Sequence, residues 1–280
     1  MINLLTVVCS QDLALLPLHI ESVEKFVSHP VRHWIILNEE DDFTDDINSI
    51  VEQHRVKNHY IVLHRNVFYD RYRQVFVNKS GWESQQVIKL AAARIIREHY
   101  FSIDCKVFFC KEIDLENLNI IGSGLYLPRS EETHWDLVDR YYAEYFGLAP
   151  TDPIMKNQTL FKILHQPIIE FEKRTPLDQA LFPSKTLTAA NPDLVFPAEH
   201  LFYYNLLRYK KCDFSAYSDP GHILEPLTNF STSYFYELKK KQTTCAYVHW
   251  KMLGSLTKED RKNLNSFLGS IGLRYKFKNR

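Results

Sequence analysis

Apolar runs alternate with amphipathic stretches over the first 110 residues of the chain. A continuous apolar run at residues 4–9 is typical of a strand that is buried on both faces. Apolar residues at helical spacing then predict a helix over residues 12–27. The pattern continues with a strand at 34–37, a helix at 47–54 and a strand at 60–63. Because strands alternate with helices, the sequence predicts an α/β fold with a mixed, mostly parallel sheet flanked by helices.

A long loop and a well-marked helix start are predicted next. Residues 65–79 are rich in Tyr, Arg and Asn and lack a clean period, so we expect a loop there. Ser80 and Glu83 have the spacing of a capping box, which predicts that a helix begins at this point. An apolar strand is expected to follow at residues 101–109.

The second half of the chain is predicted to be mainly helical. The expected helices cover residues 134–146, 154–164, 197–209 and 258–268, and short strands are expected near 212–217 and 245–249. The sequence shows no internal repeat, low-complexity segment or clear linker. We therefore predict a single domain over residues 1–280, with an α/β part at 1–127 and a mainly helical part at 128–280.

Composition narrows the range of partners. The chain has 34 basic and 34 acidic residues, so its charge gives no case for binding nucleic acid or an anionic membrane. Five scattered cysteines without a CxxC pair favour neither a zinc site nor a disulfide framework, and they indicate a reduced, cytoplasmic protein. The amino-terminal apolar run lacks a basic leader and is too short for a bilayer, so we expect no secretion signal and no membrane span.

Functional-looking side chains gather at the start of the helix that follows Ser80. Trp82, Gln85, Gln86 and Lys89 recur at i, i+3, i+4 and i+7 and therefore form one stripe. Polarity is confined to the first two turns, which suits a helix that is buried along most of its length and opens into a cleft at its start. Amides can read hydroxyls or a base edge, and a lysine can neutralise phosphate. An ordinary amphipathic surface helix would show the same spacing.

A carboxylate and an ammonium interrupt the strand predicted at residues 101–109. Asp104 and Lys106 flank Cys105 there, and charges in an apolar strand are costly unless they are matched by partners or a ligand. At the carboxyl end of a strand, an aspartate can hold a divalent cation on a diphosphate or bind a ribose hydroxyl. A lysine can bind phosphate. The alternative is a structural ion pair at an exposed strand end.

These two segments together carry a family resemblance. The sequence GWESQQVIKLAAA followed by IDCKVFF resembles an uncharacterised family of bacterial and viral glycosyltransferase-like proteins. In that family a Gly-Trp-x-x-Gln-Gln-x-x-Lys-Leu helix precedes a strand that ends in Leu-Asp-x-Asp or Leu-Asp-x-Lys. Looser matches occur in the same order along the chain, at the first strand with Asp12, at 34–39, at Thr151-Asp152-Pro153 and at 197–204.

The resemblance implies a GT-A-type nucleotide-diphosphosugar transferase fold. It implies a Leloir-type, hexosyltransferase-like enzyme of polysaccharide biosynthesis, with a nucleotide-diphosphosugar donor and a carbohydrate or glycolipid acceptor. The α/β part would bind the nucleotide sugar and the helical part would face the acceptor. Asp104 and Lys106 would stand at the metal-binding Asp-x-Asp motif, where Lys106 replaces the second carboxylate. If Mn²⁺ or Mg²⁺ is bound, Asp104 and His249 are the expected ligands. Because a lysine repels a divalent cation, metal independence is the alternative.

The remaining roles follow from the same resemblance. Glu199, Asp104 and Lys106 are the expected catalytic residues, with Glu199 as general base for the acceptor hydroxyl or as a group that orients the acceptor. An acidic residue at a helix start also suits the helix dipole, which is the structural alternative for Glu199. The expected donor-binding residues are Trp82, Gln85, Gln86, Lys89, Asp12 and Arg71.

Two other function classes are alternatives to a transferase. One is a catalytically inactive nucleotide-sugar or glycan-binding protein on the same fold. The other is a nucleotidyl-transfer enzyme, which would need a glycine-rich basic loop after its first strand. Residues 9–12 contain neither glycine nor lysine, and this counts against the nucleotidyl-transfer alternative.

Overall fold

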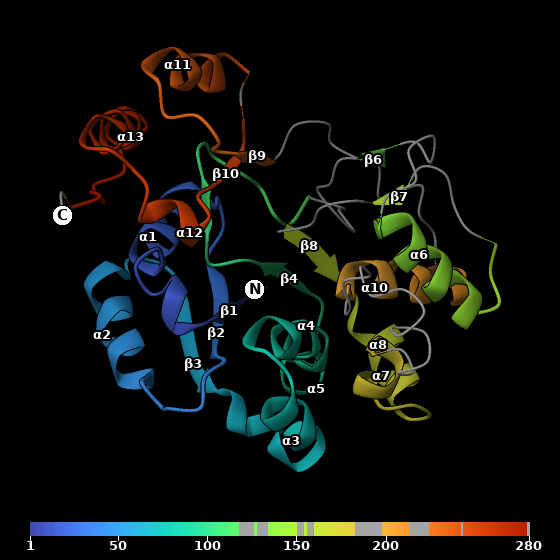
Figure 1. The fold of residues 1–280 in the computed structure, drawn as a ribbon. Helices are drawn as coiled ribbons and strands as arrows, with labels where there is room; N and C mark the ends of the chain where they lie inside the picture. Colours follow the sequence, from blue (N-terminus) through green and yellow to red (C-terminus); the bar gives the residue numbers. More distant parts are fainter. Residues whose placement is uncertain are drawn as a thin grey trace. The chain divides into compact units, whose positions relative to one another are not determined.

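The chain folds into two compact units in a computed structural model (Figure 1). Unit 1 comprises Met1–His64, Ile103–Leu118 and Pro220–Arg280, and unit 2 comprises Arg65–Ser102 and Asn119–Asp219. The structure describes residues 1–117, 126–127, 134–149, 154–155, 160–182, 198–212, 224–241 and 243–278. The prediction of a single domain over residues 1–280 stays a prediction.

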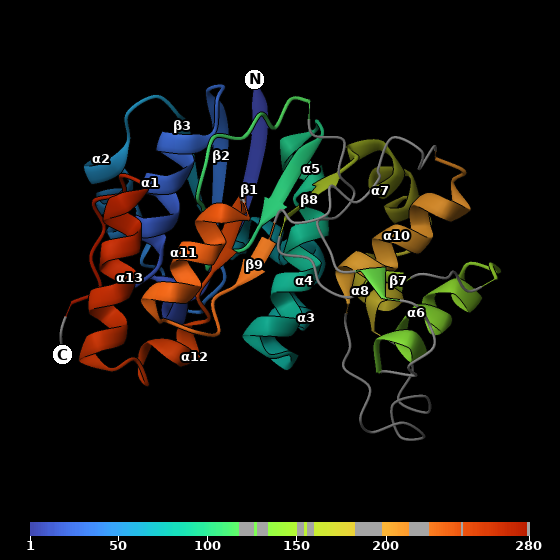
Figure 2. The ribbon, with the colours of Figure 1, turned by 90° about the horizontal axis from the view of Figure 1, so that it is seen from above.

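Three parallel strands in the order β3-β2-β1 form the centre of unit 1 (Figures 1 and 2). The register of β1 on β2 runs from Ile2 opposite Val31 to Val8 opposite Leu37. The apolar side chains of β1 and β2 are mostly buried on both faces, whereas those of β3 are only partly buried. The strands are β1 (Ile2–Val8), β2 (Val31–Leu37) and β3 (His59–His64).

Two helices cover one face of these strands. In α1 (Leu16–Phe26) and α2 (Thr44–His54), apolar residues recur at helical spacing and turn toward the sheet. They share one buried core with the strands, so both helices pack on the same side. Its members are Val8, Leu16, Ile20, Ile35, Leu37, Ile47, Val51 and Cys105.

A buried network of polar side chains lies beside this apolar core, formed by Thr6, His19 and His33. Thr6 Oγ1 lies 3.1 Å from His19 Nε2 and 2.9 Å from His33 Nε2, and His19 Nδ1 lies 2.6 Å from the carbonyl oxygen of Val107. Because a carbonyl only accepts, His19 carries its proton on Nδ1, and Thr6 donates to its Nε2. His33 then donates to Thr6. Burial lowers the pKa of His19 to about 4, although the hydrogen bond to Val107 and the charge of Asp104 raise it. Burial also lowers the pKa of His33.

The last segment of the chain completes unit 1 with a second small sheet. β10 runs antiparallel to β5 and parallel to β9. Two helices of the same segment, α11 and α13, pack through the stacked rings of Phe235 and Phe267, whose centroids lie 4.7 Å apart. The carboxylate of Glu21 accepts hydrogen bonds from the backbone N–H groups of Arg274 and Tyr275, which fixes the tail on α1. The elements are β5 (Val107–Phe109), β9 (Leu224–Pro226), β10 (Cys245–Tyr247), α11 (Thr232–Lys240), α12 (Trp250–Leu253) and α13 (Lys258–Ser270).

Unit 2 is mainly helical. Its core is aromatic, with the ring of Phe202 in contact with those of Tyr142, Phe146 and Phe171 at centroid distances of 5.5, 5.5 and 5.3 Å. Its helices are η2 (Arg65–Phe68), α3 (Tyr69–Asn78), α4 (Gly81–Ala91), α5 (Ala93–Ile96), α6 (His134–Tyr145), α7 (His165–Glu172), α8 (Leu177–Leu181) and α10 (Glu199–Tyr209). Its strands are β4 (Tyr100–Ile103, of which Ile103 belongs to unit 1) beside β8 (Leu160–Ile163), and β6 (Tyr126–Leu127) antiparallel to β7 (Ile154–Met155).

The predicted fold class is confirmed: this is an α/β fold with a mixed, mostly parallel sheet flanked by helices. Three local predictions are wrong. Residues 65–79 form η2 and α3 rather than a loop, and residues 154–164 contain β7 and β8 rather than a helix. The strand predicted at 101–109 is two strands, β4 and β5, with a turn between them. Thr151-Asp152-Pro153 and all but Cys212 of the strand predicted at 212–217 lie outside the described residues.

Candidate functional site

In unit 1, polar side chains meet at the carboxyl ends of β1 and β2. After β1, a short 3-10 helix, η1 (Ser10–Asp12), carries Asp12. After β2, Glu39 Oε1 accepts hydrogen bonds from the backbone nitrogen of Ser10 at 2.6 Å and from its hydroxyl at 2.8 Å. The backbone nitrogen of Asn38 donates to the carbonyl of Val8 at 2.8 Å, which holds the two chain segments together. In α/β sheets, ligands bind outside this edge.

A turn after β4 brings the next polar residues to the same edge. The backbone nitrogen of Val107 donates to the carbonyl of Asp104 at 2.9 Å and closes the turn. Cys105 is buried, and its Sγ lies 3.6 Å from the carbonyl oxygen of Asp12. Burial raises the pKa of the Cys105 thiol, and the carboxylates of Asp12 and Asp104 raise it further. These contacts place the turn beside Asp12.

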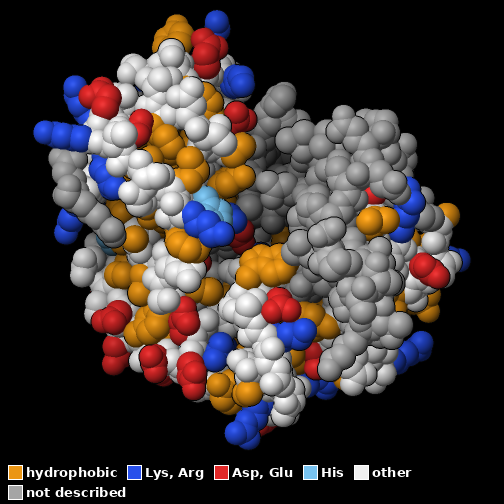
Figure 3. Space-filling model, viewed as in Figure 1, with side chains coloured by type: hydrophobic (Ala, Val, Ile, Leu, Met, Phe, Trp, Pro, Cys, Tyr) orange, Lys and Arg blue, Asp and Glu red, His pale blue; other side chains and the backbone are white. Residues whose placement is uncertain are grey.

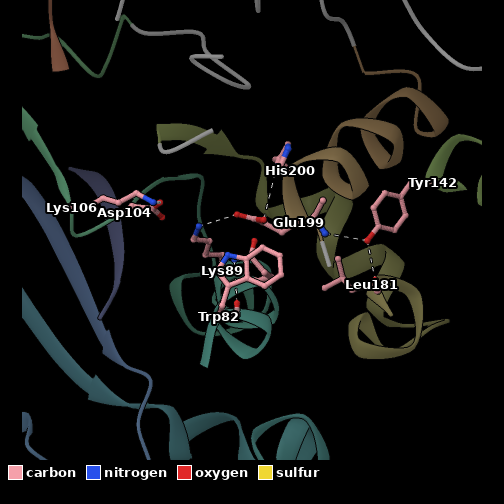
Figure 4. Close-up of polar contacts among 10 residues, drawn as sticks. Trp82, Lys89, Asp104, Lys106, Tyr142, Leu181, Glu199 and His200 are labelled. Atoms are coloured by element: carbon pink, nitrogen blue, oxygen red, sulfur yellow. Dashed lines mark hydrogen bonds and ion pairs between the residues drawn. The ribbon is translucent and has the colours of Figure 1, made fainter. Parts of the chain in front are cut away.

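Asp104 and Lys106 form an ion pair on this turn (Figure 4). Lys106 Nζ lies 3.2 Å from Asp104 Oδ2, and both side chains are partly buried. The ammonium also lies 5.6 Å from the centre of the Tyr247 ring on β10. His249 follows the same strand, and its pKa is lowered by burial and then by the charges of Lys106 and Lys251, against the opposing charge of Asp104. We call Asp12, Glu39, Asp104, Lys106 and His249 the carboxyl-edge cluster.

The carboxyl-edge cluster does not have the donor set of a divalent-cation site. Mg²⁺ and Mn²⁺ prefer oxygen ligands, and the charge of Asp104 is already matched by Lys106. His249 Nδ1 accepts a hydrogen bond from the backbone nitrogen of Lys251 at 3.2 Å and so caps α12. Within the described ranges, no three His, Cys, Asp or Glu side chains come together as a metal site would require. The residues therefore do not fit the cation that the Asp-x-Asp motif implies.

In unit 2, the start of α4 has the cap that the sequence predicts. The backbone nitrogen of Glu83 donates to Ser80 Oγ at 3.2 Å, and the Glu83 carboxylate accepts from the backbone nitrogen of Ser80 at 2.8 Å. Burial then increases along the helix. Trp82 is 43% exposed, whereas Gln86 and Lys89 are buried. This gradient confirms that α4 is exposed at its start and buried along the rest of its length.

The four residues of the predicted stripe serve different purposes. Trp82 and the half-buried Gln85 lie on the first turns of α4, where side chains are exposed. The amide of Gln86 donates to the carbonyl of Trp82 at 3.3 Å. Lys89 lies further along, where the helix is covered on all sides. Only the first two are therefore exposed enough to meet a ligand at the surface of unit 2.

Lys89 is paired with Glu199, the first residue of α10 (Figure 4). Lys89 Nζ lies 2.9 Å from Glu199 Oε1, and the two side chains are 4% and 3% exposed. His200 Nδ1 lies 3.6 Å from the other oxygen of Glu199. Burial alone would raise the pKa of Glu199, but the ammonium of Lys89 and then His200 outweigh it and hold that pKa below its usual range. A buried carboxylate kept ionised by an ammonium is a weak base, so the general-base role stays a prediction.

Arg71 lies neither in the carboxyl-edge cluster nor on α4. It is on α3 and lines a pocket of about 490 Å³ within unit 2, together with Arg94 and Arg97. Sequence reasoning missed both of these arginines and also Glu39. The signals were present: Arg94 and Arg97 are three apart at a helix end, and Glu39 follows a predicted strand.

Surface charge near the carboxyl edge is acidic. Figure 3 shows acidic side chains gathered at the lower left of this face, in the region of α2. Residues 39–46 supply six carboxylates, of which Asp45 and Asp46 lie in the first turn of α2 and suit its dipole. This sign is the opposite of a nucleic-acid footprint. None of the described helices is both long and apolar enough to span a bilayer.

Comparison with known proteins gives a family without an assigned activity. Residues 7–180 match the family described as "Family of unknown function (DUF6492)". This chain belongs to that family. The DUF6492 match includes α4, Arg71 and the Asp104–Lys106 turn, and it ends before Glu199 and His249. No curated protein matches the chain.

Among the solved structures that resemble this DUF6492 protein is one of low identity. It is the apo form of mouse xyloside xylosyltransferase 1, which is 11% identical and aligns over 89% of this chain and 97% of that chain, with a TM-score of 0.48. A TM-score under 0.5 does not establish a shared fold. The GT-A type of fold therefore stays a prediction.

Proposed function

We propose that this protein is a GT-A-type glycosyltransferase that transfers a sugar from a nucleotide-diphosphosugar donor to a carbohydrate or glycolipid acceptor. The observation that carries the proposal is the carboxyl-edge cluster, in which Asp12, Glu39, Asp104 and Lys106 converge where β1, β2 and β4 end. A carboxylate at such an edge binds a ribose hydroxyl, and a cation there binds phosphate. The cluster thus offers groups for both halves of a nucleotide diphosphate.

In this proposal Lys106 takes the place of the metal ion. Departure of the nucleoside diphosphate leaves negative charge on the phosphate oxygens, and a cation aimed at them in advance stabilises that charge. The contacts with Asp104 at 3.2 Å and with the Tyr247 ring hold the Lys106 ammonium in place. We therefore propose that transfer does not depend on Mn²⁺ or Mg²⁺.

The two ends of α4 have different proposed roles. The Trp82 ring and the Gln85 amide, at the exposed start of the helix, would contact a sugar ring and its hydroxyls. The buried pair of Lys89 and Glu199 ties α4 to α10 and is assigned a positioning role. Its burial also favours a second candidate function, a nucleotide-sugar or glycan-binding protein without catalysis, because the predicted base is engaged.

A thermal-shift panel of nucleoside diphosphates and nucleotide sugars, each with and without Mn²⁺, tests donor binding. A ligand at one hundred times its Kd adds about 2.7 kcal/mol of apparent stability. We expect at least one nucleotide sugar to stabilise the protein in the absence of metal. If none does, the transferase and a nucleotide-sugar-binding protein both fail, and of the second candidate only glycan binding is left, which the same assay with oligosaccharides tests.

Donor hydrolysis separates the enzyme from the binding protein. We expect slow release of free sugar from the stabilising donor, and loss of that release in Asp104→Asn. The matched control is Glu259→Gln, which removes one charge from an exposed position on α13. Binding without hydrolysis or transfer would establish the second candidate and reject the first.

A further inference from the structure

A basic pocket lies within unit 2 and is formed by three helices. It has a volume of about 490 Å³. The residues that line it are Arg71, Arg94, Arg97, His165, Ile169, Glu172 and Lys173. Those from α7 lie at i, i+4, i+7 and i+8 and so share one face of that helix. The three arginines come from α3 and from α5 with its cap.

The charge in this pocket is strongly unbalanced. Its lining has four side chains that are cationic at neutral pH and one carboxylate, an excess of three positive charges. The Arg71 and Arg94 side chains are 36% and 42% exposed, so they reach solvent in the pocket. Cations gathered in a hollow concentrate the field and attract anions.

The single carboxylate, Glu172, contacts two of the arginines, Arg71 and Arg94. Arg71 Nη2 donates to the carbonyl of Glu172 at 2.8 Å, and Arg71 Nε lies 3.7 Å from Oε1. Arg94 Nη1 lies 3.7 Å from Oε2, which accepts no hydrogen bond within the described part of the chain. The Tyr72 hydroxyl donates to Oε1. Glu172 is buried and fixes the guanidinium groups, while their remaining N–H donors are available to the pocket.

Arg97 lies at a helix end whose backbone conformation disfavours an arginine. It caps α5 with φ at +57°, in the left-handed region where glycine or asparagine is favoured. Its side chain lines the pocket and makes no salt bridge with any described residue. Such an outlier is a reason to suspect a function for the side chain.

We propose that this pocket binds the phosphate group of a small-molecule ligand. The planar guanidinium group pairs with phosphate oxygens through two parallel N–H donors, and three such groups surround this hollow. A sugar phosphate and a nucleoside diphosphate share this chemistry. The inference stands on contacts within unit 2 alone and does not depend on the proposed transferase activity.

Isothermal titration at constant ionic strength tests the proposal, with inorganic phosphate, glucose 6-phosphate and uridine diphosphate as probes. We expect saturable binding of phosphate to the wild type and binding weakened about tenfold or more in Arg94→Gln and in Arg97→Gly, because each variant removes a charge-assisted contact. Glycine suits the backbone at position 97, so that variant keeps the fold. The affinities for the ester and the diphosphate show which source of phosphate the pocket prefers.

Lys211→Gly is the matched control. Lys211 also has a left-handed backbone, with φ at +54°, and it is exposed and does not line the pocket. This variant is expected to bind every probe as the wild type does. The proposal is overturned if no probe binds saturably, if both arginine variants bind unchanged, or if Lys211→Gly weakens binding as much as they do.

Discussion

Lys89 Nζ lies 2.9 Å from Glu199 Oε1, across 110 positions of sequence, and both side chains are almost fully buried. Taking two charges out of water is costly, and their attraction compensates only while both are present. The pair therefore joins α4 to α10 through two charges that the interior tolerates only together. The free energy of unfolding should fall most when only one of the two partners is removed.

We predict that Lys89→Met lowers the free energy of unfolding by about 3–5 kcal/mol, because it leaves the Glu199 carboxylate buried without its ammonium. Urea denaturation measures this change. The matched control, Lys262→Ala, breaks an ion pair with Glu259 whose side chains are 77% and 68% exposed, and should cost less than about 1 kcal/mol. The double variant Lys89→Met with Glu199→Leu should lose less than the single variant. Equal losses in the test and the control would show that the buried pair contributes nothing special.

Lys106→Asp is predicted to create a Mn²⁺ site. The substitution places a second carboxylate beside Asp104 and removes the ammonium that now neutralises it. Isothermal titration with Mn²⁺ should show binding to the variant that is at least about tenfold tighter than to the wild type, because a repelling charge becomes a ligand. Lys262→Asp makes the same charge change on an exposed face of α13 and should bind Mn²⁺ as the wild type does. Equally tight binding by the wild type would contradict the role given to Lys106.

Stability should fall between pH 6.5 and pH 4 because His19 is buried as a neutral ring. Its pKa is lowered to about 4 in the fold from 6.5, so the unfolded chain binds more protons in that window. The contribution is fully present above pH 6.5 and is lost as the pH falls to 4, with a total of roughly 3 kcal/mol. Urea denaturation at several pH values measures the slope. His19→Gln should flatten it, and an unchanged slope in this variant would contradict the prediction.

Ser80→Ala is predicted to lower the free energy of unfolding by about 1 kcal/mol, because the Glu83 backbone nitrogen loses its acceptor at the start of α4. Thermal or urea denaturation measures the loss. Ser49→Ala is the control. Ser49 lies exposed within α2, and its hydroxyl donates only to the carbonyl of Asp45, so alanine there should be neutral or slightly stabilising. A similar loss at both positions would mean that the capping box is not the cause.

Continuous apolar runs and apolar residues at helical spacing predicted the elements whose burial is regular. β1, β2, α1 and α10 are all present, although β2 begins at Val31 rather than at residue 34 and α1 begins at Leu16 rather than at residue 12. Residues 65–79 were misassigned for a physical reason. Within α3 the backbone of Tyr72 is not helical, with φ at −119° and ψ at 18°, so no single period passes through the segment.

The candidate site was only partly predictable. Asp104 and Lys106 are separated by one residue, so their contact is local, and the sequence could suggest it. The contact between Lys89 and Glu199, in contrast, depends on how distant helices pack, and no spacing along the chain encodes that. For the same reason the pocket around Arg71 could not be foreseen, since α3, α5 and α7 are brought together only by the fold.

The way unit 1 is assembled has a consequence for the protein during its synthesis. This unit draws on Met1–His64, Ile103–Leu118 and Pro220–Arg280, and β5 can pair with β10 only after the last of these has left the ribosome. Unit 2 has all of its residues once Asp219 has been made. Nascent chains should therefore acquire protease resistance in unit 2 first, while the small sheet of β5, β9 and β10 stays open to proteolysis until residues 220–280 have been made.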